Sequence, residues 1–273
     1  MNKYPLVSVL IPVYNGEKVI AEAIKSCINQ TYKNIEVIVV DNHSDDDTKE
    51  EINRFNDERI AYYRNDANLG MVGNWNRCLS LANGEYIQFV CADDILDERS
   101  IEKKMSLAAK SDEICMVFSD TAIIDANGKK IMSRKSFRKS GVFDGKRLAR
   151  HSYLLRNVYG EPSNVMFKKK TIGKIGDFSG KMRYAVDWDM WLRISAVGRV
   201  GYVAEELSFY RVDSSNTTSK MKLDAILRDD KIMVENVKNN DNLHISLFEH
   251  VAHRIVVIIR FFARKLFMAL TTR

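Results

Sequence analysis

The stretch VSVLIPVYNGEKVIAEAIKSCINQTYKNIEVIVVDNHSDD, residues 7–46, decides the fold. An apolar run over 6–11 predicts a buried strand, and residues 17–29 carry apolar side chains at helical spacing. A β-branched run over 35–40 predicts a second buried strand, which ends at Asp41. Strand, helix and strand in this order predict two parallel strands of one sheet, joined by a helix.

The same alternation continues along the chain. Ser44 or Asp45 is expected to cap a helix, and the turn signal at 125–128 predicts a hairpin over 121–131. Residues 129–150 are expected to form a loop with a short helix. Further strands are expected at 59–64, 86–91, 115–119, 164–167, 199–205 and 207–211, and further helices at 70–82, 96–105, 187–197 and beyond 220. The sequence therefore predicts an α/β fold, with a Rossmann-like, mostly parallel sheet flanked by helices and a C-terminal helical extension.

Composition indicates a globular protein. The chain has 273 residues, of which 45% are hydrophobic and 29% charged, and this balance excludes a disordered chain. The four cysteines, at 27, 78, 91 and 115, have no paired spacing, so buried thiols are expected instead of disulfides or a zinc site. The start lacks the pattern of a signal peptide, and charges interrupt the apolar stretch 251–270. A cytoplasmic protein is expected.

The net charge of +6 is unevenly distributed. Residues 129–150 hold nine Lys or Arg and one Asp, giving +8, and residues 244–273 hold five and one Glu, giving +4. The remainder of the chain is therefore −6. Local basic segments favour a diphosphate or an anionic membrane surface as partner. Nucleic acid is not expected, because only the basic stretch supports it.

The segment 244–273 has apolar residues at steps of three or four, with basic residues on or near the other side. This pattern predicts a basic amphipathic helix. Two readings stay open: a helix in a membrane interface, on the inner face of the membrane, or a helix packed on the domain or on a second subunit as a homo-oligomer. His250 and His253 lack acids or cysteines nearby in the sequence, so they are interpreted as surface or packing residues and not metal ligands.

Polar side chains follow the predicted parallel strands, at the edge where ligands bind in such sheets. Asp93 and Asp94 follow the fourth strand, and adjacent carboxylates suit a divalent cation such as Mg²⁺ or Mn²⁺. The alternative is a turn with a helix cap. Asp41 can accept a hydrogen bond from a base or ribose; the alternative is again a cap, although neighbouring residues could serve. Tyr14 offers a face for stacking, or packs in its loop.

A third acid lies in the sequence Asp187-Trp188-Asp189. Trp188 and Trp191 can supply an apolar wall, which would raise the pKa of a neighbouring carboxyl toward that of a general base. The alternative is that Asp187 caps the helix that follows.

Six blocks together resemble the family 2 inverting nucleotide-sugar glycosyltransferases, which have the GT-A fold. They are VSVLIPVYNG (7–16), VIVVDNHSDD (37–46), NLGMVGNWNR (68–77), FVCADDIL (89–96), VDWDMWLRI (186–194) and YRVDSSNTTS (210–219). The resemblance implies a GT-A domain over 1–219, with a nucleotide-binding half (1–119) and an acceptor and catalytic half (120–219). Residues 220–273 then form the helical extension.

The resemblance also implies roles for single residues. On the donor side, Asp41 binds the base, usually uracil, and Arg211 lies in a loop that closes over the diphosphate. The other implied nucleotide- or donor-binding residues are Pro12, Tyr14, Asn15, Asn68, Gly70, Arg77 and Asp93. Asp93 and Asp94 are the implied holders of the ribose and the metal. Asp187 is the implied catalytic base, and Trp188 and Trp191 lie on the acceptor side.

The chain departs from the family pattern at four places. Cys91 stands where an Asp is frequent, and Val186 where a Glu is common. Asp213 replaces a frequent His and is a candidate third metal ligand. The triplet 42–44 replaces the usual Asp-Gly-Ser.

The resulting hypothesis is a transferase that moves a sugar, with inversion, from a nucleotide-diphosphate donor to an acceptor hydroxyl. UDP is favoured through Asp41, and Mn²⁺ or Mg²⁺ is the implied cofactor. The acceptor would be a glycan, glycolipid or glycoprotein in cell-surface polysaccharide or related synthesis. A glycoside hydrolase would need two carboxylates flanking one bond, whereas the acids here follow strands in the manner of a nucleotide site. A nucleotidyltransferase would need a Gly-rich basic loop after the first strand, and residues 12–17 are neither Gly-rich nor basic. A non-catalytic nucleotide-sugar-binding or scaffold homologue is the remaining alternative, kept open by Cys91, Val186 and Asp213.

Overall fold

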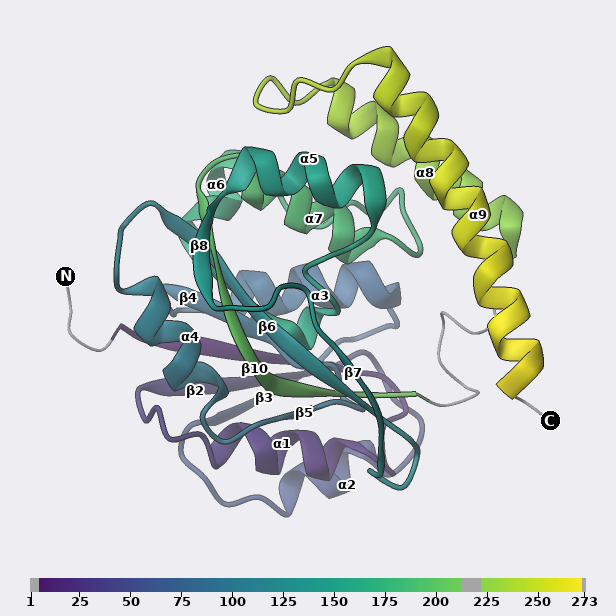
Figure 1. The fold of residues 1–273 in the computed structure, drawn as a ribbon. Helices are drawn as coiled ribbons and strands as arrows, with labels where there is room; N and C mark the ends of the chain where they lie inside the picture. Colours follow the sequence, from purple (N-terminus) through teal and green to yellow (C-terminus); the bar gives the residue numbers. More distant parts are fainter. Residues whose placement is uncertain (1–4, 213–221, 272–273) are drawn as a thin grey trace.

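The computed structural model describes residues 5–212 and 222–271, without the side chains of 263–271. Its N-terminal half alternates strands and helices as predicted (Figure 1). The four strands are parallel and lie in the order β3-β2-β1-β4. The strands are β1 (Val7–Val13), β2 (Ile35–Asp41), β3 (Ile60–Arg64) and β4 (Tyr86–Phe89), and the helices are α1 (Ile20–Ile28), α2 (Thr48–Asn53) and α3 (Gly70–Leu81).

The second half continues the same sheet in the order β9-β6-β10-β5, with β7 on β6 and β8 on β10. β9 is antiparallel to both of its neighbours, and β10 is parallel to β6. The strands are β5 (Ile95–Leu96), β6 (Ile114–Ile124), β7 (Lys130–Arg134), β8 (Gly141–Asp144), β9 (Val165–Lys168) and β10 (Arg199–Arg211). The helices are α4 (Ser100–Ala108), α5 (Gly145–Leu155), α6 (Ile172–Ile175) and α7 (Val186–Ser195).

Helices cover both faces of the sheet, because the strands carry apolar side chains on both faces. Successive side chains of a strand point to opposite faces. Val7, Val9 and Ile11 of β1 accordingly pack with α1, α2 and α4, whereas Leu10 packs with α3, α5 and α7. This arrangement confirms the predicted α/β class with a central sheet flanked by helices. β6 runs across residues 119 and 120, so the two predicted halves share one strand, and the division into domains stays a prediction.

Several predicted boundaries are wrong for local reasons. α2 begins at Thr48, and Ser44 instead donates its N–H to Asp41. The two strands expected at 199–211 are one strand, β10, with irregular register near Glu206. The expected loop over 129–150 contains β7, β8 and the start of α5, because β6 and β10 both offer edges for pairing.

The C-terminal extension consists of two helices, α8 (Leu223–Lys238) and α9 (Leu247–Thr271). α9 packs on α5 through His253, whose ring stacks on Tyr153 with 3.9 Å between centroids. Nε2 of His253 lies 2.7 Å from Oδ1 of Asp230 on α8. His250 and His253 are both buried, which agrees with the expectation that they are packing residues. Nothing in the sequence indicated the acid beside His253, Asp230. Among the described residues, no helix combines the length and apolarity that a membrane crossing requires.

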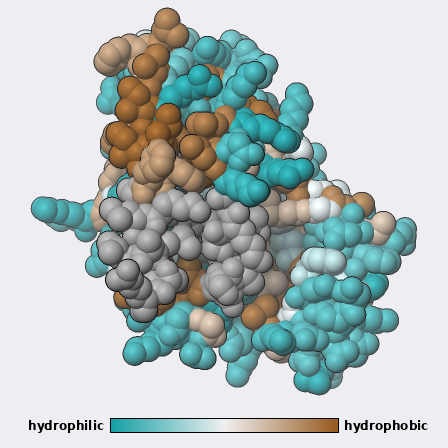
Figure 2. Space-filling view, turned by 90° about the vertical axis from the view of Figure 1, so that its right-hand side faces the viewer, coloured by the Kyte–Doolittle hydropathy of each residue, from teal (hydrophilic) through white to brown (hydrophobic). Residues whose placement is uncertain are grey.

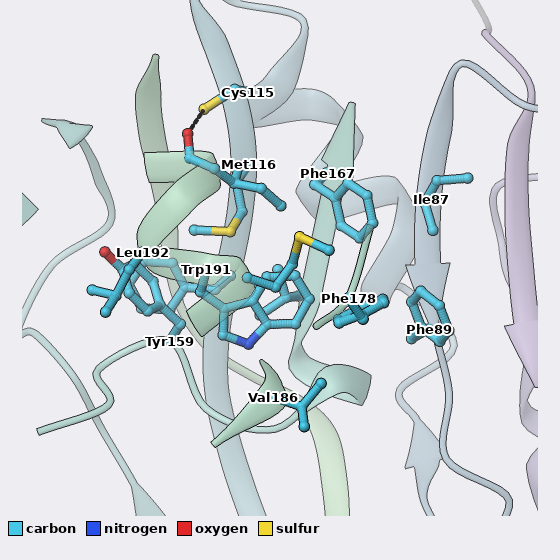
Figure 3. Packing of buried hydrophobic residues seen from close by; sticks show 14 of the residues in the cluster. Ile87, Phe89, Cys115, Met116, Tyr159, Phe167, Phe178, Val186, Trp191 and Leu192 are labelled. Carbon is cyan, nitrogen blue, oxygen red and sulfur yellow. Dashed lines mark hydrogen bonds between the residues drawn. The ribbon is translucent and has the colours of Figure 1, made fainter. Parts of the chain in front are cut away.

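Trp191 lies at the centre of the larger core cluster (Figure 3). It is 0% exposed and packs against Phe167 and Phe178, at ring-centroid distances of 5.8 and 6.3 Å. The expected place of Trp191 beside the acceptor is therefore wrong, because the side chain does not reach the surface. Within the described residues its indole N–H has no hydrogen-bond partner.

Replacing Trp191 by Ala should lower the free energy of unfolding by about 3–5 kcal/mol, because it opens a cavity in the core. Trp191→Phe is the matched control, since it keeps an aromatic ring and removes the buried N–H; we expect it to cost less than about half of that. Chemical denaturation followed by circular dichroism measures both. Equal costs for the two variants would contradict the central packing role.

Candidate active site

The loops after β1 and β2 are joined at the carboxyl-terminal edge of the sheet. Asn42 N–H donates to the carbonyl of Val13 at 2.8 Å, and Asn15 N–H donates to Oγ of Ser44 at 2.9 Å. Asn15 has a φ of 51° and its side-chain oxygen accepts the N–H of Asp45. These bonds hold the first two expected site segments side by side at one edge.

Asp41 is fully buried at this edge, and its carboxylate has three donors. Ser44 N–H donates to Oδ1 at 2.8 Å, and Oδ2 accepts from the hydroxyl of Tyr62 at 2.9 Å and from Arg64 at 2.8 Å. Burial and the neighbouring Asp41 raise the pKa of Tyr62 to about 12, so the hydroxyl remains a donor. A carboxylate offers about four acceptor positions, so one stays unused, but the side chain of Asp41 is 0% exposed and a ligand could reach it only if Arg64 or Tyr62 moved.

A network of asparagines fixes the loop that leads into α3. Oδ1 of Asn42 accepts from Nδ2 of Asn65 at 3.0 Å and from the N–H of Leu69 at 2.9 Å. Nδ2 of Asn42 donates to Asn68 at 2.8 Å, and Gly70 follows with a φ of 72°. Asn42, the first residue of the triplet 42–44 that differs from the family pattern, thus joins the loop after β2 to the loop before α3. The sequence alone did not indicate this role.

His43 adopts a φ of 68°, a backbone conformation that favours glycine. It occupies the position at which the family pattern has Gly. The left-handed conformation is therefore kept although the residue has changed.

Asp94 is the buried acid of the turn after β4. Oδ2 accepts from the hydroxyl of Ser163 at 2.5 Å, and Oδ1 accepts the N–H of Arg211 at 3.1 Å. Removal from water, and next the charge of Asp93, raise the pKa of Asp94 well above its ordinary value. Carboxylates in this state are stabilised in their charged form by a bound cation.

The residues of this turn suit a hard divalent cation. Candidate ligand atoms of Cys91, Asp93 and Asp94 all lie within 4.8 Å of one another. Burial, and next the charge of Asp94, raise the pKa of the Cys91 thiol, which therefore stays protonated and is a poor ligand. Mg²⁺ and Mn²⁺ prefer carboxylate oxygens, so Asp93 and Asp94 are the candidate ligands. The expected third ligand, Asp213, lies outside the described residues.

Arg211 is the last residue of β10 and is buried, so its expected place in a loop is wrong. Its guanidinium donates to the carbonyls of Asp93 at 3.0 Å and Ala126 at 2.9 Å, and it pairs with Glu22. Together with the N–H bond to Asp94, these contacts hold the acidic turn against the strand end. A further role in donor binding stays a prediction.

Asp187 lies in the first turn of α7, and the cap position before that helix is Ala185, so the capping alternative is wrong. Loss of water raises the pKa of Asp187 to about 7; Glu161 adds to the rise, and the N–H of Trp188 and the charge of Arg134 oppose it. The charge of Asp187 also contributes to the raised pKa of the Cys91 thiol, so Asp187 and Cys91 lie within electrostatic reach of each other.

Glu161 and Arg134 form an ion pair beside Asp187 that the sequence did not indicate. Gly160 makes room for it, because a Cβ at this position would lie 2.7 Å from Nη2 of Arg134. Ser163 lies two residues after Glu161, and its hydroxyl donates to Asp94. The segment 160–163 therefore contacts both Arg134 and the acidic turn. A Gly-Glu-Pro turn was the available signal, but nothing in the sequence connects it to β7 or to the acids.

The remaining expected residues are placed as follows. Pro12 is buried in β1 beyond the end of β4, where its missing N–H costs no sheet bond. Tyr14 is 51% exposed at the edge. Arg77 is exposed, but it lies seven residues into α3 and about 10 Å along the axis from Gly70. Trp188 donates its indole N–H to Ser152 of α5 at 2.9 Å and so faces the helical layer.

A mostly parallel sheet flanked by helices, with acids in the loops at the carboxyl ends of its strands, defines the class of the protein as α/β. The family model for glycosyl transferase family 2 matches residues 8–184. The chain belongs to this family.

Relatives and solved structures agree with this assignment. An uncharacterized glycosyltransferase of Rickettsia typhi is 29% identical over 79% of this chain and 66% of its own length, so the chain spans about two thirds of that relative. The UDP-Glc:α-D-GlcNAc-diphosphoundecaprenol β-1,3-glucosyltransferase WfgD of Escherichia coli is 29% identical over 78% of the chain and 80% of its own length.

Two solved structures have the same GT-A fold. TarS of S. aureus in complex with UDP-GlcNAc has a TM-score of 0.72 at 18% identity, covering 98% of this chain and 76% of that one. The mannosyltransferase PcManGT of Pyrobaculum calidifontis, in complex with GDP-Man and Mn²⁺, has a TM-score of 0.62 at 16% identity, covering 93% and 70%.

Asp93→Asn should weaken Mn²⁺ binding by about tenfold or more, because it removes a charged oxygen ligand. Cys91→Ser is the matched control from the same turn and should bind Mn²⁺ as the parent does. Electron paramagnetic resonance of free Mn²⁺ measures both affinities. A larger loss in Cys91→Ser than in Asp93→Asn would show that the thiol, and not the carboxylates, holds the ion.

Proposed function

We propose that the protein transfers a sugar from a UDP-sugar to an acceptor hydroxyl with inversion at the anomeric carbon, in a metal-dependent reaction. The observation that carries the proposal is Asp187, a half-buried carboxyl with a pKa of about 7, whose charge acts on Cys91 in the turn that also carries Asp93 and Asp94. Family 2 membership supports transfer over hydrolysis.

The donor nucleoside would bind along the edge formed by the β1 and β2 loops. Asp41 would accept an N–H of the base at its fourth acceptor position when Arg64, whose side chain is 38% exposed, moves aside. Tyr14 is exposed at the same edge and offers a face for stacking. Pro12, Asn15, Asn68 and Gly70 shape the loops around it. UDP is favoured because WfgD uses UDP-Glc and because TarS was solved with UDP-GlcNAc.

Asp93 and Asp94 would hold Mn²⁺ or Mg²⁺ next to the donor diphosphate. When bound, the cation neutralises negative charge on the departing nucleoside diphosphate. Asp94 is presented by Ser163 and by the N–H of Arg211, which fix the orientation of its carboxylate.

Asp187 would take the proton of the acceptor hydroxyl as that oxygen attacks the sugar. A carboxyl with a pKa near neutrality is half deprotonated at the operating pH and still basic enough to accept a proton. Attack from the side opposite the diphosphate inverts the anomeric carbon. The pair Arg134–Glu161 lies beside this carboxyl and influences its charge.

The acceptor is proposed to be a glycan hydroxyl, with a sugar on a lipid diphosphate carrier as the leading class. WfgD, whose printed activity is on a diphosphoundecaprenol-linked GlcNAc, supports this class. A glycoprotein or free polysaccharide acceptor would use the same chemistry. The product would then belong to the assembly of a cell-surface glycan.

Asp187→Asn should bind UDP as the parent does and lose transfer by about 10²–10⁴-fold, because the amide cannot accept the proton. In the parent, protonation below pH 7 removes the base, so kcat/KM should rise with pH through about 7; the residual rate of the variant should lack this step. Radiolabelled sugar transfer and UDP calorimetry measure the two quantities.

Transfer at the parent rate by Asp187→Asn would show that Asp187 is not the base. Parent protein that binds UDP-sugars without transferring or hydrolysing them would support the non-catalytic homologue.

A further inference from the structure

An apolar stripe on α9 faces away from the protein. Its side chains are between 40% and 80% exposed, and Figure 2, which views the molecule from the α9 side, shows hydrophobic residues gathered there. The stripe is formed by Phe248, Val251, Ile255, Ile258, Ile259 and Phe262. At 3.6 residues per turn these positions fall within an arc of about 100°. His250 and His253, on the opposite side of the helix, contact Tyr153 of α5.

The folding of the domain does not use this stripe. α9 is held by its other side, through the His–Tyr contacts and through Arg150 of α5, whose Nε lies 2.6 Å from Glu249. A continuous exposed apolar surface of this length is rare on a soluble monomer and marks a surface that meets something apolar.

The charge beside the stripe indicates what that partner is. Among the described side chains of α5 and α9, Glu249 is the single acid. The basic residues on the same two helices are Lys146, Arg147, Arg150, Arg254 and Arg260. Arg254 lies next to the stripe and pairs with Asp230 of α8, whereas Arg260 lies on the packed side over the ring of Trp188. The two helices together carry an excess of basic residues, and an apolar face on a basic helix is the pattern of a helix that lies in a membrane interface with anionic lipids.

We propose that α9 docks this protein on an anionic membrane surface, with the stripe inserted at the level of the headgroups. A second copy of the chain is a poorer occupant, because a two-fold contact through α9 would bring two basic helix pairs together. The docking goes beyond the proposed transfer and does not depend on it.

Co-sedimentation of the full chain with lipid vesicles tests the docking, without any nucleotide present. We expect binding to vesicles that contain phosphatidylglycerol, weaker binding to pure phosphatidylcholine vesicles, and a decrease with salt. The double variant Ile255→Ser with Ile259→Ser should bind about tenfold more weakly or worse. Ile131→Ser with Met132→Ser, which changes two equally exposed apolar residues on β7, should bind as the parent does.

Thermal melting followed by circular dichroism establishes that both double variants fold. No binding by the parent, or equal binding by the α9 variant, would overturn the proposal. Equal binding to both kinds of vesicle would overturn its electrostatic part. A parent dimer in analytical ultracentrifugation that the α9 variant abolishes, without vesicle binding, would make the stripe a contact between copies.

A separate observation concerns α8. Oδ2 of Asp229, which is buried, accepts three consecutive backbone N–H groups, from Arg183 at 2.9 Å, Tyr184 at 2.5 Å and Ala185 at 3.2 Å. These residues directly precede α7, and α7 has no side-chain cap of its own. The carboxylate of Asp229 therefore fixes, from another element, the turn through which the chain enters α7.

A second bond joins the same two helices. Nδ2 of Asn236 on α8 donates at 2.7 Å to Oδ1 of Asp189, two residues after Asp187. The bonds to Asp229 fix the turn that enters α7, and the bond from Asn236 holds Asp189 in the first turn, where Asp187 also lies. We infer that Asp229 is a positioning residue for Asp187, an inference that rests on the proposed function. The helical extension would thereby help to complete the active site.

Steady-state kinetics of Asp229→Ala, Asp229→Asn and the exposed control Asp224→Ala test this role. We expect kcat of Asp229→Ala to fall about tenfold or more, because the base is displaced, with donor KM within about twofold of the parent. Asp229→Asn keeps a side-chain oxygen that can accept the N–H groups and should restore much of kcat. Asp224→Ala should match the parent.

An unchanged kcat in Asp229→Ala, or a loss equal to the unfolded fraction, would overturn the inference. If that variant does not fold, Asn236→Ala removes only the second bond; it should also lower kcat at unchanged donor KM, and parental kcat would contradict the inference. A parent that transfers no sugar would instead refute the proposed function.

Discussion

Withdrawing carboxylates from water costs free energy, and this structure does so fully at Asp94 and partly at Asp93 and Asp187. The pKa of Asp94 is raised by burial and by Asp93, and that of Asp187 by burial and then by Glu161. Parallel strands bring the loop of Asp93 and Asp94 to the edge where the other loops meet, and Asp187 comes from the first turn of α7. In the proposed reaction, a bound cation and a proton in transfer would offset this cost.

Hydrogen bonds from the surrounding structure offset part of the free-energy cost of burying Asp94. The Ser163 hydroxyl and the N–H of Arg211 donate to Asp94, so its carboxylate is oriented while its pKa remains high. The guanidinium of Arg211 is bound to carbonyls and to Glu22, and therefore stabilises the turn more than it neutralises the acids. Cys91 contributes no charge to the turn, so the like-charge repulsion is lower than an Asp at that position would produce.

Local pattern was sufficient to predict the alternating half of the fold and the acids at its strand ends. Strand burial, helical spacing and the residue after each strand are all properties of short windows. The partners of those acids come from distant segments: Tyr62 for Asp41, Ser163 for Asp94, and Arg134 with Glu161 near Asp187. Trp191 was misassigned because helical spacing does not tell which side of α7 faces the core. The bond from Arg183, just before α7, to Asp229 spans 46 residues, and no local pattern in the sequence indicates it.

The central claim is that a cation held by Asp93 and Asp94 shares one edge with a nucleoside bound beside Asp41. A crystal structure of the protein with UDP and Mn²⁺ tests it most directly, through the anomalous signal of manganese. We expect the peak between the carboxylates of Asp93 and Asp94, with the uracil ring next to Asp41. A peak at any other position, or UDP bound away from this edge, would contradict the claim.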